Sequence, residues 1–421
     1  MIAVAERLRT GFVSPILRES VEFRRFFAGQ AISLVGDQIT LIALPLVGVL
    51  VLHANAAQMG YLFTAALVPN LLFSLHAGAW VDRRGRRRQT MLVADLGRAA
   101  LLVSVPVAYA LDELTLEQLS VVGFLVGTLS VFFYVSYNTL FVSLVTRERY
   151  IEASALLNGS RALSFVAGPS LGGALVQALS APAALVADAV SFLASAFSLS
   201  RISPEEPQTE QQERGNVMVG VRYILGSPIM RASLAATATI NFFNFVFWAL
   251  FILFATRSLG VPPGVLGAVL GAAAVGGVIG SVFTGRISRR IGVGPAYVLG
   301  CIVFPVPLVL VPLAGGPRAV VLGCLFLAQF GSGFGVMLVD IVGGSIKAAL
   351  VPKRLLARVS GAYMVVNYGV RPLGALVGGA LGTAIGLRPT LWIASVGAIA
   401  GFLFLLPSPI PGLRTLPETD E

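Results

Sequence analysis

Long apolar runs are the feature that most constrains this chain. Twelve runs of 19–29 residues follow one another, with short polar segments between them. A helix that crosses a bilayer needs about 20 mostly apolar residues, and a membrane β-strand needs about 10 residues of alternating polarity. Since no such alternation appears, we expect an all-α membrane protein with twelve transmembrane helices. The predicted spans are 26–52, 57–80, 89–111, 116–144, 153–179, 182–200, 231–256, 262–285, 294–314, 318–345, 357–385 and 389–407.

Composition agrees with this fold class and excludes others. Charged residues make up 12% of the chain and hydrophobic residues 56%, whereas an ordinary soluble domain carries about 25% charged residues. This excludes a soluble enzyme and a disordered protein. Cys301 and Cys324 lie inside apolar runs and imply no disulfide framework, and two histidines are too few for a His-rich metal site. We expect no metal and no cofactor.

Lysine and arginine are distributed unequally between the two sides of the membrane. The predicted spans place 24 of them on one side and 3 on the other, with Arg98, Arg161 and Arg371 inside spans. Because basic loops stay in the cytoplasm, both termini are predicted to be cytoplasmic. The same asymmetry accounts for the net charge of +10 without nucleic acid. The basic arm before the first run is not typical of a cleaved signal peptide, so we expect this run to be retained.

A long polar break divides the chain into two parts. The predicted organisation is an N-terminal arm (1–25), a six-helix half (26–200), a cytoplasmic linker (201–230) with a short amphipathic helix near its end, a second six-helix half (231–407) and a tail (408–421). Arginine-rich loops after the second and eighth spans, and Pro169 and Pro372 in the fifth and eleventh, repeat at an offset of 203 residues. This indicates a duplicated unit; chance in Gly-rich and Arg-rich sequence is the alternative.

Two motifs resemble those of the major facilitator superfamily of secondary transporters. The loop between spans 2 and 3 is similar to the family pattern G-x-x-x-D-R-x-G-R-R, through Gly78, Asp82, Arg83, Gly85 and Arg86. Span 5 resembles the GPxxGG motif of proton-driven exporters, through Gly168, Pro169, Gly172 and Gly173. The resemblance implies two six-helix halves that rock around a midplane site. It also implies that Asp82, Arg83 and Arg86 latch the halves on the cytoplasmic side; a plain positive-inside anchor is the alternative.

Shorter segments are similar to one branch of that family. Residues 36–38, 95–98 and 188–193 resemble bacterial macrolide and enterobactin exporters, which favours export of hydrophobic or siderophore-like cargo. The chain also departs from the family pattern. Many drug–proton antiporters carry an arginine in span 4, but 116–144 contains none, and Gly285 stands where the first half has Asp82.

No enzymatic or ATP-driven chemistry is encoded. Neither Lys347 nor Lys353 has the neighbours of a P-loop lysine, and no G-x-S-x-G nucleophile motif occurs. We therefore expect a transporter driven by an ion gradient, by the substrate gradient or by another subunit.

Asp37 is the main candidate for proton coupling. It lies about 16 Å along span 1, near the midplane, where a charge is costly unless it is paired or faces water. A hydrogen-bonded Asp that only packs helices is the alternative, and sodium is the alternative ion. Asp95 and Arg98, three residues apart, are expected to form a structural ion pair. Asp188 and Asp340 could titrate, or could cap a helix or form a pair. Arg161 or Arg371 could be the counter-charge of Asp37, with snorkelling or interhelix pairing as the alternative.

Polar and aromatic side chains at helical spacing suggest a substrate cavity for a bulky, largely apolar ligand. Interhelical hydrogen bonding is the alternative for each of them. The candidates are Gln30, Ser33, Tyr134, Tyr137, Asn138, Asn241, Asn244, Trp248, Gln329 and Asn367.

Together these features predict a proton-coupled exporter of hydrophobic or amphiphilic small molecules, monomeric in the bacterial inner membrane. Its expected partners are the substrate, protons and the lipid bilayer, with no nucleic acid. A dedicated exporter of a siderophore or another secreted metabolite is the alternative. A scaffold or sensor that transports nothing is the alternative from a different class.

Overall fold

A computed structural model describes residues 14–204 and 217–416. Parts of the predicted arm (1–13), linker (205–216) and tail (417–421) lie outside the described residues. Throughout the described ranges the regular structure is helical, without a β-strand. The predicted all-α class is confirmed.

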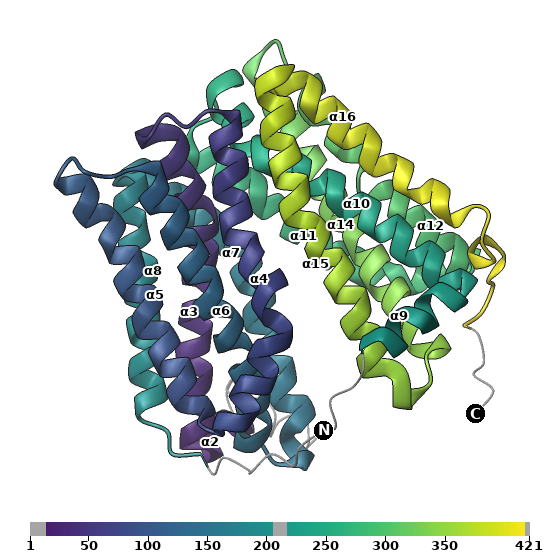
Figure 1. Cartoon of the computed structure of the whole chain (residues 1–421), viewed down its shortest axis with the longest axis horizontal. Helices are drawn as coiled ribbons and strands as arrows, with labels where there is room; N and C mark the ends of the chain where they lie inside the picture. The colour runs from purple at the N-terminus through teal and green to yellow at the C-terminus, as the bar shows by residue number, and fades with distance from the viewer. Residues whose placement is uncertain (1–13, 205–216, 417–421) are drawn as a thin grey trace, which may run out of the picture.

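The helices form two bundles that lie side by side (Figure 1). The N-terminal bundle contains α2 (Pro15–Glu19), α3 (Val21–Leu46), η1 (Val47–Val51), α4 (Ala56–Arg84), α5 (Arg87–Ala110), α6 (Leu116–Leu144), η2 (Arg147–Arg149), α7 (Tyr150–Ala178) and α8 (Ala181–Ser200). The C-terminal bundle contains α9 (Val217–Gly226), α10 (Pro228–Leu253), η3 (Phe254–Ser258), α11 (Pro263–Ile291), α12 (Val293–Val303), η4 (Val306–Val309), α13 (Leu310–Leu313), α14 (Arg318–Leu350), η5 (Lys353–Leu355), α15 (Leu356–Ala384), α16 (Leu387–Ala400), η6 (Gly401–Leu405) and η7 (Ile410–Gly412).

Ten helical segments of the described chain are long and apolar enough to cross a membrane. The two other predicted spans correspond to α7 and α15, which are helices of 29 residues each but fall outside that set of ten. Both helices pack against the opposite bundle, α7 on α11 and α15 on α4. The total of twelve membrane crossings stays a prediction.

Local sequence signals explain where α4 begins and ends. The Asn55 side chain accepts a hydrogen bond from the Gln58 backbone N–H at 2.9 Å, and the Gln58 side chain accepts one from the Asn55 N–H at 2.8 Å. This reciprocal cap satisfies two free donors of the first turn. At the other end Gly85 has φ +62°, a left-handed conformation that glycine adopts without steric cost. Gly85 therefore stops α4 within the arginine cluster, after Arg84.

Glycines bring the two bundles into close contact. Gly173 of α7 faces Gly267 of α11, and Gly60 of α4 faces Gly379 of α15. A methyl group on Gly379 would lie only 3.0 Å from the Cα of Gly60. Hydrogen bonds cross at the same helix pairs, from Gly264 N–H to the Gln177 side chain (2.9 Å) and from the Thr64 hydroxyl to the Pro372 carbonyl (3.2 Å). The two helix pairs join the halves toward the helix ends that lie opposite the basic loops.

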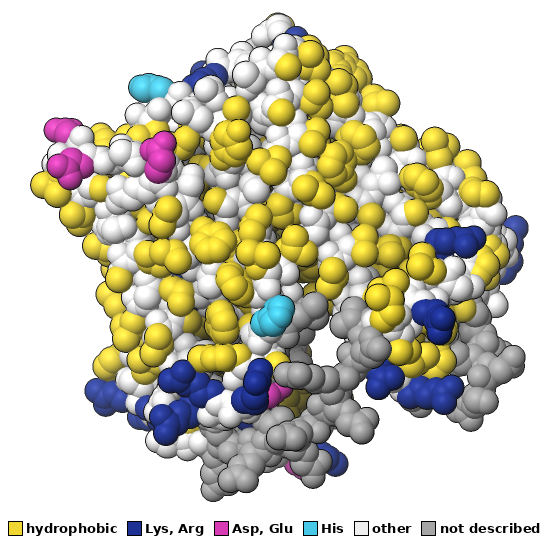
Figure 2. Space-filling view, viewed as in Figure 1, with side chains coloured by type: hydrophobic (Ala, Val, Ile, Leu, Met, Phe, Trp, Pro, Cys, Tyr) yellow, Lys and Arg dark blue, Asp and Glu magenta, His cyan; other side chains and the backbone are white. Residues whose placement is uncertain are grey.

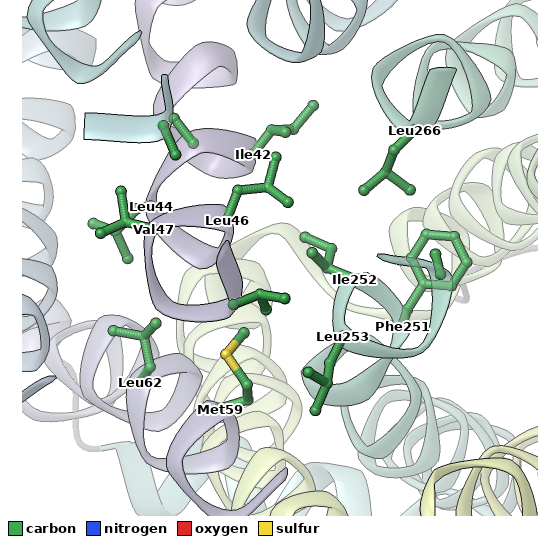
Figure 3. Packing of buried hydrophobic residues seen from close by; sticks show 14 of the residues in the cluster. Ile42, Leu44, Leu46, Val47, Met59, Leu62, Phe251, Ile252, Leu253 and Leu266 are labelled. Atoms are coloured by element: carbon green, nitrogen blue, oxygen red, sulfur yellow. The ribbon is translucent and has the colours of Figure 1, made fainter. Parts of the chain in front are cut away.

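The bundles meet most extensively at the end opposite the basic loops. There, Leu46 from α3 and Met59 from α4 lie close to Ile252 and Leu253 from α10 in one buried apolar cluster (Figure 3). The Arg257 guanidinium also donates a hydrogen bond to the Val49 carbonyl at 3.2 Å, which links η3 to η1. This end of the molecule is closed.

The basic end is arranged differently. Lys and Arg side chains gather along the lower edge of both bundles in Figure 2, the edge at which α2 and α9 lie in Figure 1. The bundles splay apart toward this edge (Figure 1). Its basic character agrees with the predicted cytoplasmic side, although the placement of the termini stays a prediction.

Two predicted boundaries differ from the structure. The first helix begins at Val21, five residues before the predicted span, because the Ser20 side chain caps it by accepting from the Phe23 N–H. The chain after residue 407 is partly packed: Ile410 is fully buried, and the Leu413 carbonyl accepts from the Gly294 N–H at 2.8 Å. α9 lies where the short amphipathic helix is predicted, and the Tyr223 hydroxyl ties it to the Leu350 carbonyl at 2.6 Å.

Replacing Gly173 by Val tests the contact between α7 and α11. The new side chain would collide with the Pro263 carbonyl and the Gly267 backbone, and overpacking of this kind costs about 1–3 kcal/mol. We expect a lower midpoint of thermal unfolding, measured by labelling of the buried thiol of Cys301 in detergent. The matched control is Gly159→Val on the same helix, where no atom lies within 4 Å. Equal stability of the two variants would contradict the assigned contact.

Candidate functional site

Two adjoining cavities open between and beside the bundles, in the half of the molecule nearer the basic end. One, of about 620 Å³, lies between the bundles, among residues of α4, α6, α7 and α15. The other, of about 450 Å³, lies among α10, α12, α14 and α15. Met364 and Tyr368 line both, so we call them the N-terminal lobe and the C-terminal lobe of one site. Figure 2 shows the surface hollowed between the bundles toward this end.

Asp37 lies behind the wall of the N-terminal lobe. The Tyr134 hydroxyl, which lines that lobe, donates a hydrogen bond to Asp37 Oδ2 at 3.1 Å. The Asp37 side chain is 28% exposed to solvent, whereas the Asp95 side chain is fully buried. Tyr134 thus connects the span-1 carboxylate to the cavity.

Arg98 supplies the counter-charge of Asp37. One guanidinium nitrogen of Arg98 lies 3.7 Å from Asp37 Oδ1, and the other is paired with Asp95. Arg161 and Arg371, the possible counter-charges named from the sequence, form no ion pair with Asp37 among the described residues, although Arg161 is near enough to attract it. The expected Asp95–Arg98 pair is present, and it extends to a third charge.

Aromatic rings and α6 hold Arg98 in place. Its guanidinium lies 4.3 Å from the ring centroid of Phe133 and 4.0 Å from that of Phe192. It also donates a hydrogen bond to the Ser130 hydroxyl at 3.3 Å. α6, the predicted fourth span, has no arginine of its own, but the Arg98 guanidinium from α5 contacts it. The sequence does not predict these two rings, because cation–π partners on different helices share no regular spacing.

Asp188 lies in the same region, on α8. Its side chain is fully buried and accepts a hydrogen bond from the Ser191 hydroxyl at 2.8 Å, while Oδ2 has no hydrogen-bond partner among the described residues. It packs against Gly36, where a methyl group would collide with Asp188 Oδ1. The residue before Asp37 is therefore a glycine because the carboxylate of Asp188 fills that space.

A hydroxyl and amide network lines the C-terminal lobe. Asn241 donates to the Asn367 side chain at 3.0 Å, so the two amides predicted for the cavity meet there. The Tyr363 hydroxyl lies 2.7 Å from the Thr237 hydroxyl and 3.1 Å from that of Ser233. Ser233 and Thr237 were missed in the sequence, although they continue the Asn241 face at steps of four residues. Asn244 also lines this lobe, and its Oδ1 has no hydrogen-bond partner within the described part of the chain.

Charged and amide side chains complete the lining of the two lobes. Asp340, Lys347 and Arg371 line the C-terminal lobe, and Arg161 and the neutral Asn138 line the N-terminal lobe. The Arg371 guanidinium lies 4.1 Å from the ring centroid of Tyr368.

Five residues predicted for the cavity line neither lobe. Gln30 and Ser33 are buried, and Gln30 donates to the Ser195 hydroxyl of α8 at 3.3 Å. Tyr137 stacks on Phe26 at 5.4 Å. Trp248 packs edge-on against two phenylalanines of its own helix, and Gln329 is buried in α14. Helical spacing identifies a shared face, but not the neighbour that this face meets.

The two family motifs occupy different places. In the last turn of α4, Asp82 lies 3.8 Å from Arg87 at the start of α5, and Arg83 donates to the Ala79 carbonyl of its own helix at 3.0 Å. Arg86 is the N-cap residue of α5, and Gly78 has no atom near its missing side chain. In α7, Gly168 packs on Gln38, Gly172 on Ile39 and Gly173 on Gly267. The second motif is therefore a packing surface with one face on α3 and the other on the opposite bundle.

Comparisons with known proteins point to one family. The sequence model of the Major Facilitator Superfamily matches residues 26–253 and 234–421. The chain is 26% identical to the "Multidrug efflux pump Tap" of Mycolicibacterium fortuitum, over 87% of this chain and 92% of that protein. It is 25% identical to the "Uncharacterized MFS-type transporter YfiS" of Bacillus subtilis (strain 168), over 89% of each chain.

Solved structures agree in fold. A bacterial homologue of the iron transporter ferroportin in an inward-facing state superimposes with a TM-score of 0.74 at 17% identity, covering 94% of this chain and 99% of that one. The nucleoside transporter NupG also gives a TM-score of 0.74, at 12% identity, covering 92% of this chain and 98% of that one.

Removing Arg98 tests its part in holding the carboxylates. Breaking a buried ion pair by loss of one partner costs about 3–5 kcal/mol, because the other charge stays buried. We expect Arg98→Gln to lower the midpoint of thermal unfolding strongly, and the double variant Arg98→Gln/Asp95→Asn to recover part of the loss. Arg83→Gln, at an exposed arginine near the basic end, is the control. A double variant no more stable than Arg98→Gln alone would contradict the shared pair.

Proposed function

This chain belongs to the major facilitator superfamily, and we propose that it is a proton-coupled exporter of hydrophobic or amphiphilic small molecules. Members of this family are transporters and not enzymes, and with bacterial relatives and ten membrane-length helical segments the chain is a multi-pass inner-membrane protein. The name of the mycobacterial relative as a multidrug efflux pump supports export as the direction.

The arrangement around Asp37 carries the proposal of proton coupling. Asp37 and Asp95 share one guanidinium, that of Arg98, and the nearby Asp188 forms no ion pair with a described residue. Uncompensated charge in a membrane interior is unfavourable, so a proton on one carboxylate would bring the cluster closer to neutrality. Asp37 is the member in contact with the cavity, through the hydroxyl of Tyr134. It is therefore the group through which we expect a proton to enter and leave.

Alternating access would link this proton to the substrate. In the present conformation the end opposite the basic loops is closed and both lobes lie nearer the basic end. Rocking about the glycine contacts of α7–α11 and α4–α15 would close the lobes on one side and open them on the other. Asp82 now pairs with Arg87 of its own bundle; we propose that it engages the second bundle when the basic end closes.

Asp37→Asn is the central test. Efflux of lipophilic dyes and macrolides is measured from cells that express the chain, with and without a protonophore. We expect protonophore-sensitive efflux that Asp37→Asn abolishes, because the amide cannot exchange a proton, at unchanged membrane expression. Asp112→Asn is the matched control, since Asp112 lies in the exposed turn between α5 and α6 and Asn tolerates its positive φ.

Other outcomes decide between the alternatives. Undiminished efflux by Asp37→Asn would overturn its coupling role. Efflux that requires a sodium gradient and resists the protonophore would show that sodium, and not the proton, is the coupling ion. With normal expression and no efflux of any compound, a dedicated exporter of a secreted metabolite becomes the favoured function. Such an exporter gains support from the positive charge of the cavity lining.

A further inference from the structure

The charges that line the two lobes do not balance. Arg161 lines the N-terminal lobe, and Lys347, Arg371 and a single carboxylate, Asp340, line the C-terminal lobe. None of these four residues forms an ion pair with any described residue. The lining therefore carries an excess of positive charge, and a cleft with low-dielectric walls concentrates such a field.

The excess lies where a ligand can meet it. The Arg371 guanidinium is stacked on Tyr368 (4.1 Å) and lies 5.2 Å from the Phe245 ring centroid, and its Nε is buried without a hydrogen-bond partner among the residues described. The Lys347 ammonium lies 5.5 Å from the ring centroid of Tyr363, across the same lobe. Arg371 also forms a side-chain hydrogen bond with Tyr368 and is attracted by Asp340. A guanidinium has five N–H donors and an ammonium three, so both groups keep donors for a bound acid.

Asp37 is the carboxylate that contacts the N-terminal lobe. It accepts from Tyr134 and shares Arg98 with Asp95, and in the proposed function it exchanges the proton, so we do not assign it to the ligand. The rest of that lobe is largely apolar, with Leu71, Val131 and Val365 in its wall. Its volume of about 620 Å³ is in the range of pockets for drug-sized ligands.

We propose that the substrates are amphiphilic organic acids. The acidic group binds between Arg371 and Lys347 in the C-terminal lobe, and the apolar body extends past Met364 into the N-terminal lobe. This inference rests on the proposed export function and adds to it the charge of the cargo: anionic and not cationic. Arg371 is then a specificity-determining residue, while Asp37 serves the proton.

A binding experiment tests the charge preference directly. The full chain is placed in lipid nanodiscs and titrated with three probes that share a dansyl fluorophore and an undecyl chain: the carboxylic acid, its methyl ester and a trimethylammonium analogue. Empty nanodiscs correct for partition into lipid. We expect the acid to bind at least about tenfold more tightly than the cation, because hydrogen bonds between charged groups form only with the acid. Equal or tighter binding of the cation overturns the proposal.

Variants then locate the acid site. Arg371→Gln is expected to weaken binding of the acid about tenfold and to leave the ester nearly unchanged, and Arg371→Lys to retain most of the preference. The matched control is Arg286→Gln, because Arg286 also stacks on a ring, Phe283 at 5.7 Å, but lines neither lobe. Should Arg371→Gln fail to fold, Lys347→Gln gives the same test. A preference for acid that survives the loss of either cation overturns the assigned site.

The outcome is separable from that of the efflux experiment. Binding in nanodiscs needs no gradient, so preference for the acid without protonophore-sensitive efflux would overturn proton-coupled export but not the charge of the ligand. Efflux of cationic dyes that depends on Asp37, together with no preference for the acid, would keep the export function and overturn this inference.

Discussion

A charge inside a membrane has to be neutralised by another group or has to face water, and this constraint organises the interior of the protein. Arg98 is the main example. Its guanidinium lies between the carboxylates of Asp37 and Asp95 and is enclosed by the rings of Phe133 and Phe192. Four helices, α3, α5, α6 and α8, converge on this one side chain. The packing of the N-terminal bundle and the chemistry proposed for Asp37 therefore depend on the same contact.

The two halves divide the charges between them in different ways. In the N-terminal bundle the carboxylates outnumber the guanidinium that they share, and Tyr134 connects the cluster to the cavity. In the C-terminal bundle, Arg371 and Lys347 exceed Asp340, and all three line the cavity. A proton site and a ligand site can thus lie in one chain without competing for the same groups, and movement of the halves about their glycine contacts would couple them.

α7 and α15 show why the fold needs helices that are less apolar than the others. Each packs against the opposite bundle and contributes residues to the cavity lining, Arg161 from α7 and Arg371 from α15. Where each helix lies between the opposite bundle and the polar cavity, it contacts protein instead of lipid, so polar side chains are tolerated there. Both helices still expose apolar side chains, such as Leu163 of α7 and Leu373 of α15.

The sequence by itself determined the all-helical membrane fold, the two halves and the presence of an intramembrane aspartate, because hydropathy and charge asymmetry are properties of single segments. It also predicted the Asp95–Arg98 pair, since three residues on one helix meet locally. Only the tertiary structure decided that Arg98, and not Arg161 or Arg371, pairs with Asp37, that Gln30 contacts α8 and that Ser233 and Thr237 join the cavity network. Each of these depends on which helices become neighbours and how each is rotated, and helical spacing within one segment carries no information about its partner.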